Sequence, residues 1–488
     1  EKKLYGLNAS GVAPAALSAA LVRELGHQTM PQAGWIPTMV PGAPAGWAEL
    51  NRRFGTKPLP QLFAPAISAA REGVPVQVNL EPMWEEDARR IAAAMEREQQ
   101  LESLRQEIQQ LLYVSGRGEQ AVLLPAAETL PHLAPGGLAG LLKQLDQRSA
   151  AAVRDGLEEL AATGCESYYR GPLMEQIVAF SRATGGYFCE DDFRNYKPEW
   201  VEPISTDYKG YTVCEIPPNG HGITVLMALN LLKGLKLSDQ KDCADTYHKI
   251  LESIKLAFAD TRTYVADPRY MRTRVEDLLS EEYAARRRAL ISEQALTPEA
   301  GDPSCGGTIY LCTADPQGNM VSFIQSNYTT FGAGVAIPGT GISLQNRGAN
   351  FSLDEGSDNC LAGGKRSYHT IIPGFLSKDG KAVGPFGVMG GFMQPQGHVQ
   401  VLTNMIDFHM NPQEALDAPR WMWTGEKKIS LERLYNSEMA DKLTRTGHDI
   451  TIPVNSLEFG RGQIILRDDD GTLCGATEPR TDGTVAVW

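Results

Sequence analysis

The chain lacks the features that mark several classes of protein. No apolar run approaches the roughly 20 residues of a membrane-spanning helix, and no cluster of basic and aromatic residues offsets the net charge of −13. The sequence contains no internal repeat and no low-complexity segment. These absences argue against a membrane or a nucleic acid as a partner. The 488 residues suffice for one large core or for two to three domains.

Cysteine and histidine are scattered, with eight of each. No cysteines form a CxxC pair and no histidines form a metal-type doublet, which argues against a zinc site and against a disulfide scaffold. We therefore predict no metal and no cofactor. Isolated cysteines of this kind are typical of a reducing compartment. Because the residues from Glu1 to Tyr5 do not have the pattern of a signal peptide, a cytoplasmic location is expected.

Two long helical stretches are predicted between about residues 84 and 164. Leucine and isoleucine recur there every three or four residues, which is the spacing of an amphipathic helix. Pro131 and the run Pro135-Gly136-Gly137 separate the two stretches. This segment is expected to form a helical subdomain that serves packing rather than binding.

Helices and strands alternate after residue 170, and strands dominate from Thr308 onward. The patterns predict helices at 173–182, 223–235, 244–259, 270–300 and 398–408, and strands at 211–216, 320–326, 342–351, 371–376 and 382–389. Residues 297–304 are predicted to form an exposed connector. Strands on both sides of Thr308 with long helices outside predict an α+β fold, in which sheets lie between helix layers.

Thr308 is the most informative residue, because a strand-like run begins abruptly at it after Gly306-Gly307. A threonine hydroxyl needs a neighbouring base to act as a nucleophile. Cleavage before Thr308 would supply that base, since a free α-amine has a pKa of about 7.7–8.0, near the working pH that suits a general base. The glycines would ease distortion of the peptide bond. Many threonines at strand starts are purely structural, so this local pattern alone favours a structural role.

Short motifs follow one another along nearly the whole chain: Phe54-Gly55-Thr56-Lys57-Pro58-Leu59 with Ala64-Pro65-Ala66-Ile67, Tyr169-Arg170-Gly171-Pro172, Pro217-Pro218-Asn219-Gly220-His221-Gly222, Ala259-Asp260 with Tyr264 and Asp267-Pro268, Thr329-Thr330-Phe331-Gly332, Lys365-Arg366, Gly390-Gly391, and Ala415-Leu416-Asp417-Ala418-Pro419-Arg420. Together and in this order they resemble the γ-glutamyltransferase (glutathione hydrolase) family of N-terminal-nucleophile hydrolases. Segment 84–164 is the part least like the family. The resemblance implies an αββα four-layer sandwich. It also implies a proenzyme that cuts itself into a large fragment, 1–307, and a small fragment, 308–488.

The resemblance also assigns catalytic roles. Thr308 takes the place of the nucleophile, and Ser326 takes the place of a threonine that supports the amine of that nucleophile. Gly390 and Gly391 match paired glycines whose N–H groups form the oxyanion hole. Glycine suits that role because its backbone can come close to the developing negative charge.

The start of the chain departs from the family pattern. Ser10 and Gly11 stand where the family has an arginine and a glutamate in the γ-glutamyl pocket. The family's usual first block, with a glycine-rich motif, has no counterpart before Glu1, which leaves an exported form open.

The remaining pocket positions depart as well. Arg347 and Asn350 replace residues that hold the substrate's α-amine, His369 and Thr370 replace a serine pair, and Tyr328 replaces an asparagine. An α-amino acid head needs one cation and one anion, whereas these positions offer a cation and neutral groups. They suit a carboxylate without a facing amine, bound in a bidentate manner. A glutaryl amide is such a substrate, and family members with this pattern resemble cephalosporin acylases.

Three functions are compatible with the sequence. The leading one is an autoprocessing threonine amidase or acyltransferase that cleaves γ-glutamyl amides such as glutathione through an acyl-enzyme on Thr308, with water or an amine as acceptor. The alternative is a glutaryl-type (cephalosporin) acylase. The weaker alternative is a non-catalytic remnant that binds ligands. The two fragments of the precursor are the expected partners of each other, and a homo-oligomer stays open.

Overall fold

The computed structural model describes residues 3–73, 151–298, 307–329, 331–435, 437–454 and 456–487. The helices are α1 (Ala19–Glu24), α2 (Ala43–Phe54), α3 (Leu59–Glu72), α6 (Ser167–Arg170), α7 (Pro172–Ala183), α8 (Glu190–Arg194), α9 (Gly222–Lys233), α10 (Ala244–Tyr264), α11 (Val275–Leu278), α12 (Glu281–Arg288), α13 (Met393–Ile406), α14 (Pro412–Asp417) and α15 (Ser437–Arg445), with 3-10 turns η1 (Arg347–Asn350) and η2 (Leu457–Phe459). None of these helices combines the length and the apolar character needed to cross a bilayer.

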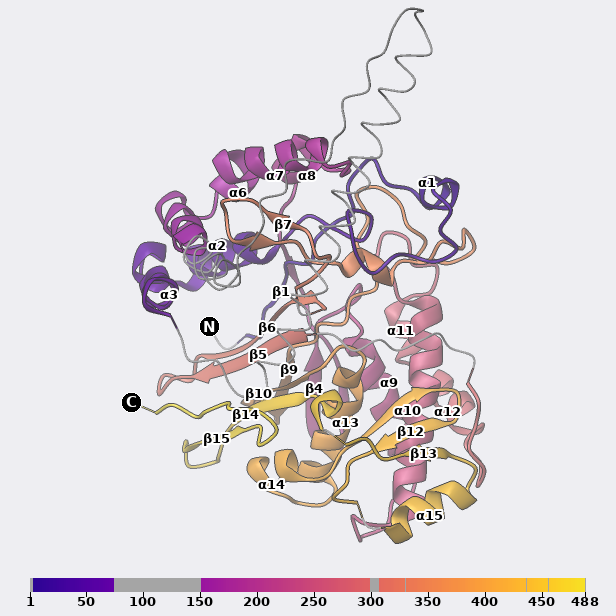
Figure 1. The fold of residues 1–488 in the computed structure, drawn as a ribbon. Coiled ribbons are helices and arrows are strands. Elements are labelled where there is room, and N and C mark those ends of the chain that lie inside the picture. Colours follow the sequence, from indigo (N-terminus) through magenta and orange to yellow (C-terminus); the bar gives the residue numbers. More distant parts are fainter. Residues whose placement is uncertain are drawn as a thin grey trace, which may run out of the picture.

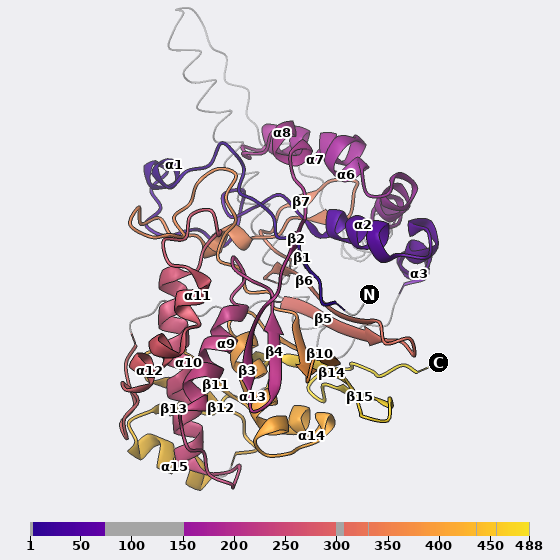
Figure 2. The same cartoon turned by 180° about the vertical axis from the view of Figure 1, so that it is seen from behind.

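The strands form one large sheet and several small ones (Figures 1 and 2). The large sheet has the order β15-β14-β10-β9-β4-β3. The strands are β1 (Gly6–Asn8), β2 (Glu199–Val201), β3 (Ile204–Tyr208), β4 (Tyr211–Glu215), β5 (Gly307–Ala314), β6 (Met320–Tyr328), β7 (Ala336–Ile337), β8 (Ile342–Ser343), β9 (Gly374–Lys378), β10 (Lys381–Met389), β11 (Trp421–Gly425), β12 (Lys428–Leu431), β13 (Asp449–Thr451), β14 (Arg461–Arg467) and β15 (Leu473–Thr477).

The two faces of the large sheet carry different layers. Phe386 and Val388 of β10 belong to the main core, together with residues of α9, α10 and α13. Gly387 lies between them and faces the other way, because a Cβ there would lie 2.5 Å from the ring of Tyr310 in β5. Strand alternation therefore places helices on one face of the sheet and the β5–β6 hairpin on the other.

Beyond the hairpin lies the fourth layer. Trp47 of α2 donates a hydrogen bond from Nε1 to Gln325 Oε1 of β6 at 3.0 Å and packs against Phe63 of α3. Part of the outer face of the hairpin is open, since Ile309 and Leu311 are 58% and 42% exposed. The expected α+β fold with helix, sheet, sheet and helix layers is confirmed.

Most predicted elements of the described residues are present, with shifted ends. The predicted strand 342–351 is wrong: only Ile342–Ser343 pairs, and the chain then turns into η1. The side chain of Gln345 accepts a hydrogen bond from the N–H of Arg347 at 2.5 Å, which replaces a sheet partner by a local one. Residues 270–300 hold two short helices, α11 and α12, instead of one continuous stretch.

The segment 84–164 lies mainly outside the described residues. Residues 151–163 are described and are helical. The predicted connector 297–304 also lies largely outside the described residues.

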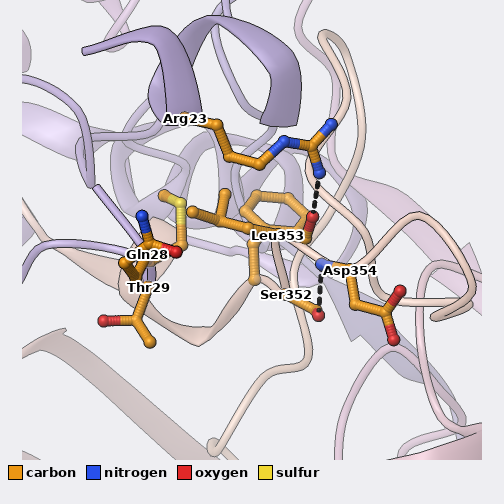
Figure 3. Close-up of a pocket in the computed structure, with 8 residues that line it drawn as sticks. Arg23, Gln28, Thr29, Ser352, Leu353 and Asp354 are labelled. Atoms are coloured by element: carbon orange, nitrogen blue, oxygen red, sulfur yellow. Dashed lines mark hydrogen bonds between the residues drawn. The ribbon is translucent and has the colours of Figure 1, made fainter. Parts of the chain in front are cut away.

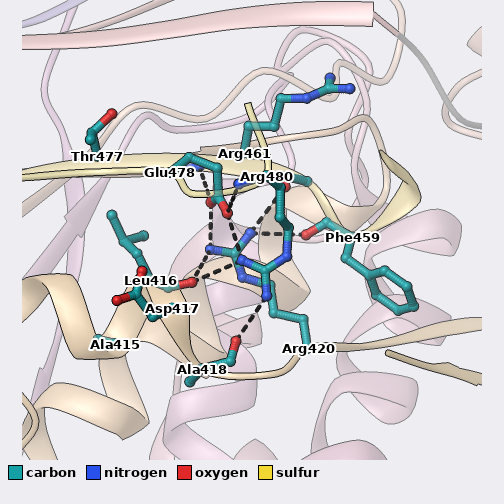
Figure 4. A network of polar contacts seen from close by, with 12 residues as sticks. Ala415, Leu416, Asp417, Ala418, Arg420, Phe459, Arg461, Thr477, Glu478 and Arg480 are labelled. Atoms are coloured by element: carbon teal, nitrogen blue, oxygen red, sulfur yellow. Dashed lines mark hydrogen bonds and ion pairs between the residues drawn. The ribbon is translucent and has the colours of Figure 1, made fainter. Parts of the chain in front are cut away.

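A buried charge network fixes the start of β14 (Figure 4). Glu478 accepts hydrogen bonds from Arg420 Nη2 at 2.7 Å, from Arg480 Nη1 at 2.5 Å and from the N–H of Gly462 at 2.7 Å. Arg420 Nη1 in turn donates to the carbonyls of Phe459 and Gly460 at 3.0 and 3.1 Å. The network therefore holds the chain that leads from η2 into β14.

Replacing Glu478 by glutamine is expected to destabilise the fold strongly. Glu478 is 1% exposed, so its loss leaves the buried guanidinium of Arg420 without its carboxylate, while Arg480 keeps its pair with Glu432. Breaking a buried ion pair by removing one partner typically costs about 3–5 kcal/mol. Urea unfolding of Glu478→Gln and of Glu438→Gln, whose carboxylate forms an exposed pair with Lys442, measures the effect. Equal midpoints in the two variants would contradict this expectation.

Candidate active site

Thr308 lies at the start of β5, opposite Ser326 of β6 in the antiparallel register. Its Oγ1 donates a hydrogen bond to Ser326 Oγ at 3.0 Å. The same Ser326 oxygen accepts the N–H of Tyr328 at 2.7 Å. The structure therefore brings together the predicted nucleophile and its predicted support, and the backbone of β6 fixes the orientation of the support.

Two contacts determine which end of the large sheet lies under Thr308. Tyr310 of β5 covers Gly387 of β10. At the other end of the hairpin, a Cβ on Gly318 would lie 3.0 Å from Nη1 of Arg467, the last residue of β14. The direction from Arg461 to Arg467 along β14 thus follows the direction from Thr308 to Gly318, and Thr308 lies over the end where β10 runs into Gly390 and Gly391.

Gly390 and Gly391 join β10 to α13 at this end. Their φ angles are +142° and +57°, in the region that favours glycine. Their carbonyls accept the first hydrogen bonds of the helical turn, from Met393 N at 3.0 Å and Gln394 N at 3.2 Å. Among the described residues, neither N–H group of the pair has an acceptor. Two donors near a nucleophile are what an oxyanion hole requires.

Arg347 is a buried cation beside the hairpin. It is 2% exposed, its Nη1 donates to Thr370 Oγ1, and its guanidinium lies over the ring of Tyr328 at 4.9 Å. Its Nε and Nη2 have no hydrogen-bond partner. Burial lowers its pKa to about 9, and among the described residues the group that counters this shift is Tyr328 rather than a carboxylate. At neutral pH Arg347 thus remains a cation with two unused donors.

The other pocket positions surround Arg347. His369 pairs its backbone with Asn219 and His221, each through a hydrogen bond of 2.9 Å. Burial and the nearby Arg347 hold the pKa of His369 well below its ordinary value, so its imidazole is neutral. Asn350 ends the turn that begins at Arg347, and its Nδ2 is buried without a partner. The five predicted pocket residues therefore offer one cation and neutral polar groups.

Ser10 and Gly11, which depart from the family pattern near the start of the chain, lie in the same region. Ser10 Oγ lies 2.7 Å from Asn8 Oδ1 and 3.2 Å from Asn219 Oδ1. Asn219 Nδ2 donates to Ser367 O at 2.8 Å, and Ser367 Oγ donates to the carbonyl of Arg347 at 3.0 Å. The sequence analysis named Asn219 within a motif but assigned it no role in the pocket, because its burial at 1% exposure depends on the fold.

Gly11 cannot be replaced by a glutamate in this backbone. A Cβ at Gly11 would lie 1.9 Å from the carbonyl oxygen of Val40, which is far inside van der Waals contact. The tight approach of the two segments is fixed by a hydrogen bond from Val40 N to Val12 O at 3.0 Å. The local packing at Gly11 therefore excludes the glutamate that the resemblance to the family places there.

One group in the described part of the chain has the spacing of a metal site: His248, Glu252 and His448. The ammonium of Lys255 lies within this group, 2.7 Å from Glu252 Oε1 and 3.3 Å from His448 Nδ1. His248 Nδ1 lies 2.9 Å from His448 Nε2 and completes the network. Its polar atoms are thus paired with one another and with a built-in cation.

A surface pocket of about 350 Å³ lies between α1 and the segment after η1 (Figure 3). Arg23 donates to Leu353 O at 2.6 Å, and Asp354 N donates to Ser352 Oγ at 3.0 Å, so these groups are already partnered. None of the nine predicted site residues lines it. The pocket is separate from the candidate active site.

Comparison with known proteins agrees with this geometry. Residues 1–488 match the sequence model of the family described as Gamma-glutamyltranspeptidase. The chain belongs to the gamma-glutamyltranspeptidase family. It is similar to the crystal structure of cephalosporin acylase from Bacillus halodurans, with 47% identity and a TM-score of 0.86 over 100% of this chain and 85% of that one.

Two curated relatives of this chain carry different names. "Glutathione hydrolase-like YwrD proenzyme" of Bacillus subtilis (strain 168) is 36% identical over 337 residues, which cover 67% of this chain and 64% of that protein. "Acylase ACY 1 proenzyme" of Pseudomonas sp. (strain SE83) is 32% identical over 487 residues, covering 98% and 80%. The family and these relatives carry the names of enzymes, so the chain is an enzyme and the binding-remnant hypothesis is set aside.

Proposed function

We propose that this gamma-glutamyltranspeptidase family member is a self-processing amidase whose acyl substrates carry a distal carboxylate and no α-amine. The single observation that carries the proposal is Arg347. A buried guanidinium with two free donors and no described carboxylate within ion-pair distance is an unfavourable state, because a desolvated charge needs a partner. A substrate carboxylate would supply that partner through two parallel hydrogen bonds.

The chemistry would proceed through an acyl-enzyme. After cleavage between Gly307 and Thr308, the α-amine of Thr308 takes the proton of its own hydroxyl as the oxygen attacks the amide carbonyl. The N–H groups of Gly390 and Gly391 stabilise the oxyanion. Collapse of the intermediate breaks the C–N bond, and the amine leaves with the proton. Water then attacks the ester by the same route, which returns the proton to Thr308.

The γ-glutamyl alternative requires an anion for the substrate's ammonium group. Around Arg347 the described pocket offers hydroxyl, amide and neutral imidazole groups. The resemblance to the family places a glutamate at the position of Gly11, which has no room for a side chain here. These features favour a glutaryl-type acyl group, and the similarity to a cephalosporin acylase supports the same choice.

The wild-type protein is expected to hydrolyse a glutaryl anilide with a higher kcat/KM than the matching γ-glutamyl anilide. Arg347→Met should lower kcat/KM for the glutaryl compound by 10- to 100-fold, or about 1.4–2.8 kcal/mol, which lies within the range expected for hydrogen bonds to charged groups. The effect should appear mainly in KM. Release of the aniline chromophore measures both constants.

Two variants serve as controls for this measurement. Arg347→Lys keeps the charge but loses the planar pair of donors, so it should fall between wild type and Arg347→Met. Arg286→Met removes an exposed arginine of α12 and should leave the kinetics unchanged. A wild type that clearly prefers the γ-glutamyl anilide would overturn the substrate assignment and favour the γ-glutamyl alternative.

A further inference from the structure

Arg461 begins β14 and faces the space between the two sheets. Gly462, its neighbour, faces the helix layer, because a Cβ there would lie 2.6 Å from Leu416 of α14. Side chains alternate along a strand, so Arg461 points to the opposite side. It pairs with Met389 of β10, and its Nη1 lies 3.8 Å from Met389 Sδ. Figure 4 shows Arg461 on the far side of the strand from Arg420 and Glu478.

The register places Arg461 close to Thr308. Tyr310 covers Gly387, and the partner of Gly387 on β14 is Gln463. β5 and β14 run in the same direction, so moving two residues back along both strands leads from Tyr310 to Thr308 and from Gln463 to Arg461. Because β10 is antiparallel to β14, a move in the same direction leads forward along β10 from Gly387 to Met389, which directly precedes Gly390. Arg461 thus lies beneath the nucleophile and next to the oxyanion glycines.

The guanidinium of Arg461 has unused donors. Its Nε and Nη2 are buried without a hydrogen-bond partner. Burial lowers its pKa, and the carboxylate of Glu478 raises it only in part. Glu478 itself is occupied by Arg420, Arg480 and the N–H of Gly462. Arg461 is therefore a second cation in the site whose charge is not neutralised by the described residues.

We infer that Arg461 binds a carboxylate on the amine portion of the substrate, the part that leaves when the amide is cleaved. This inference rests on the proposed function. Arg347 approaches the nucleophile from the side of β6, over Tyr328, whereas Arg461 approaches from β14. Two cations on different elements around one nucleophile match an amide with an acidic group at each end. The preferred substrates are then N-acyl derivatives of amino acids or of other amines with a carboxylate.

Two glutaryl amides that differ only in the leaving group test this inference. N-glutaryl-4-aminobenzoate carries the carboxylate, and N-glutaryl-4-aminobenzamide is its neutral counterpart. The wild-type protein should prefer the first. Arg461→Met should lower the ratio of the two kcat/KM values by 10- to 100-fold, and Arg461→Lys should restore part of it. An unchanged ratio in Arg461→Met would overturn the inference.

A control and a second measurement separate this inference from the proposed function. Arg467→Met changes the same face of β14 at its distant end and should keep the wild-type ratio. Arg347→Met should slow both amides alike, because they share the glutaryl group. Binding of free 4-aminobenzoate and 4-aminobenzamide, measured by calorimetry, needs no turnover. A preference for the benzoate that Arg461→Met abolishes would support Arg461 even if neither amide is cleaved, and equal binding of both compounds by wild type would overturn it.

Discussion

Replacing Thr308 by alanine is expected to leave a single uncut chain of 488 residues without amidase activity. The wild-type protein should instead separate under denaturing conditions into fragments 1–307 and 308–488. The reason is chemical: Thr308 Oγ1, held 3.0 Å from Ser326 Oγ, is the atom that would attack the Gly307 carbonyl and later the substrate. Mass spectrometry of denatured protein identifies the fragments.

Two further variants of the hairpin sharpen this experiment. Thr313→Ala removes an exposed threonine from the outer face of the same strand and should be cut normally. Ser326→Ala removes the hydroxyl that holds Thr308 and should slow the cut without moving its position. If Thr308→Ala still splits between residues 307 and 308, self-cleavage by this hydroxyl is wrong.

Valine at Gly390 or Gly391 is expected to reduce kcat by at least on the order of 10²–10³, the usual effect of losing one oxyanion donor. A side chain at Gly390 would meet Gly460 Cα at 3.1 Å and Met393 Cβ at 3.2 Å, and both glycines have positive φ. The N–H groups would therefore shift away from the carbonyl oxygen. Steady-state kinetics with a glutaryl anilide and calorimetric binding of glutarate measure catalysis and binding separately.

Gly380→Val is the matched control for this pair. Gly380 lies in the turn between β9 and β10 with φ +72° and has open space around it, so the variant carries backbone strain far from the site. It should lose stability but keep kcat. Near-wild-type kcat in both Gly390→Val and Gly391→Val would mean that the two glycines form a structural turn and no oxyanion hole.

The sequence by itself determined the strand that begins at Thr308 and the turn that follows it. The roles of Thr308 as nucleophile and of Ser326 as its support came from the resemblance to the family and stay predictions. Antiparallel register, which follows from the positions of the hairpin strands and their turn, places the two residues opposite each other. Gly390 and Gly391 were found through the motif, and their positive φ angles explain why glycine is needed there. The hairpin depends on neighbours in the chain and was predicted from the sequence, whereas the catalytic roles stay predictions.

Only the tertiary structure decided which groups lie around Thr308. Arg347 was predicted inside a strand, but local hydrogen bonds turn that segment into η1 and bury the guanidinium beneath Tyr328. Arg461 carried no signal at all, because its proximity to Thr308 results from the packing of two sheets whose strands are far apart in sequence. The charge balance inside a pocket depends on many such contacts between distant residues. It therefore cannot be predicted from the spacing of residues along the sequence.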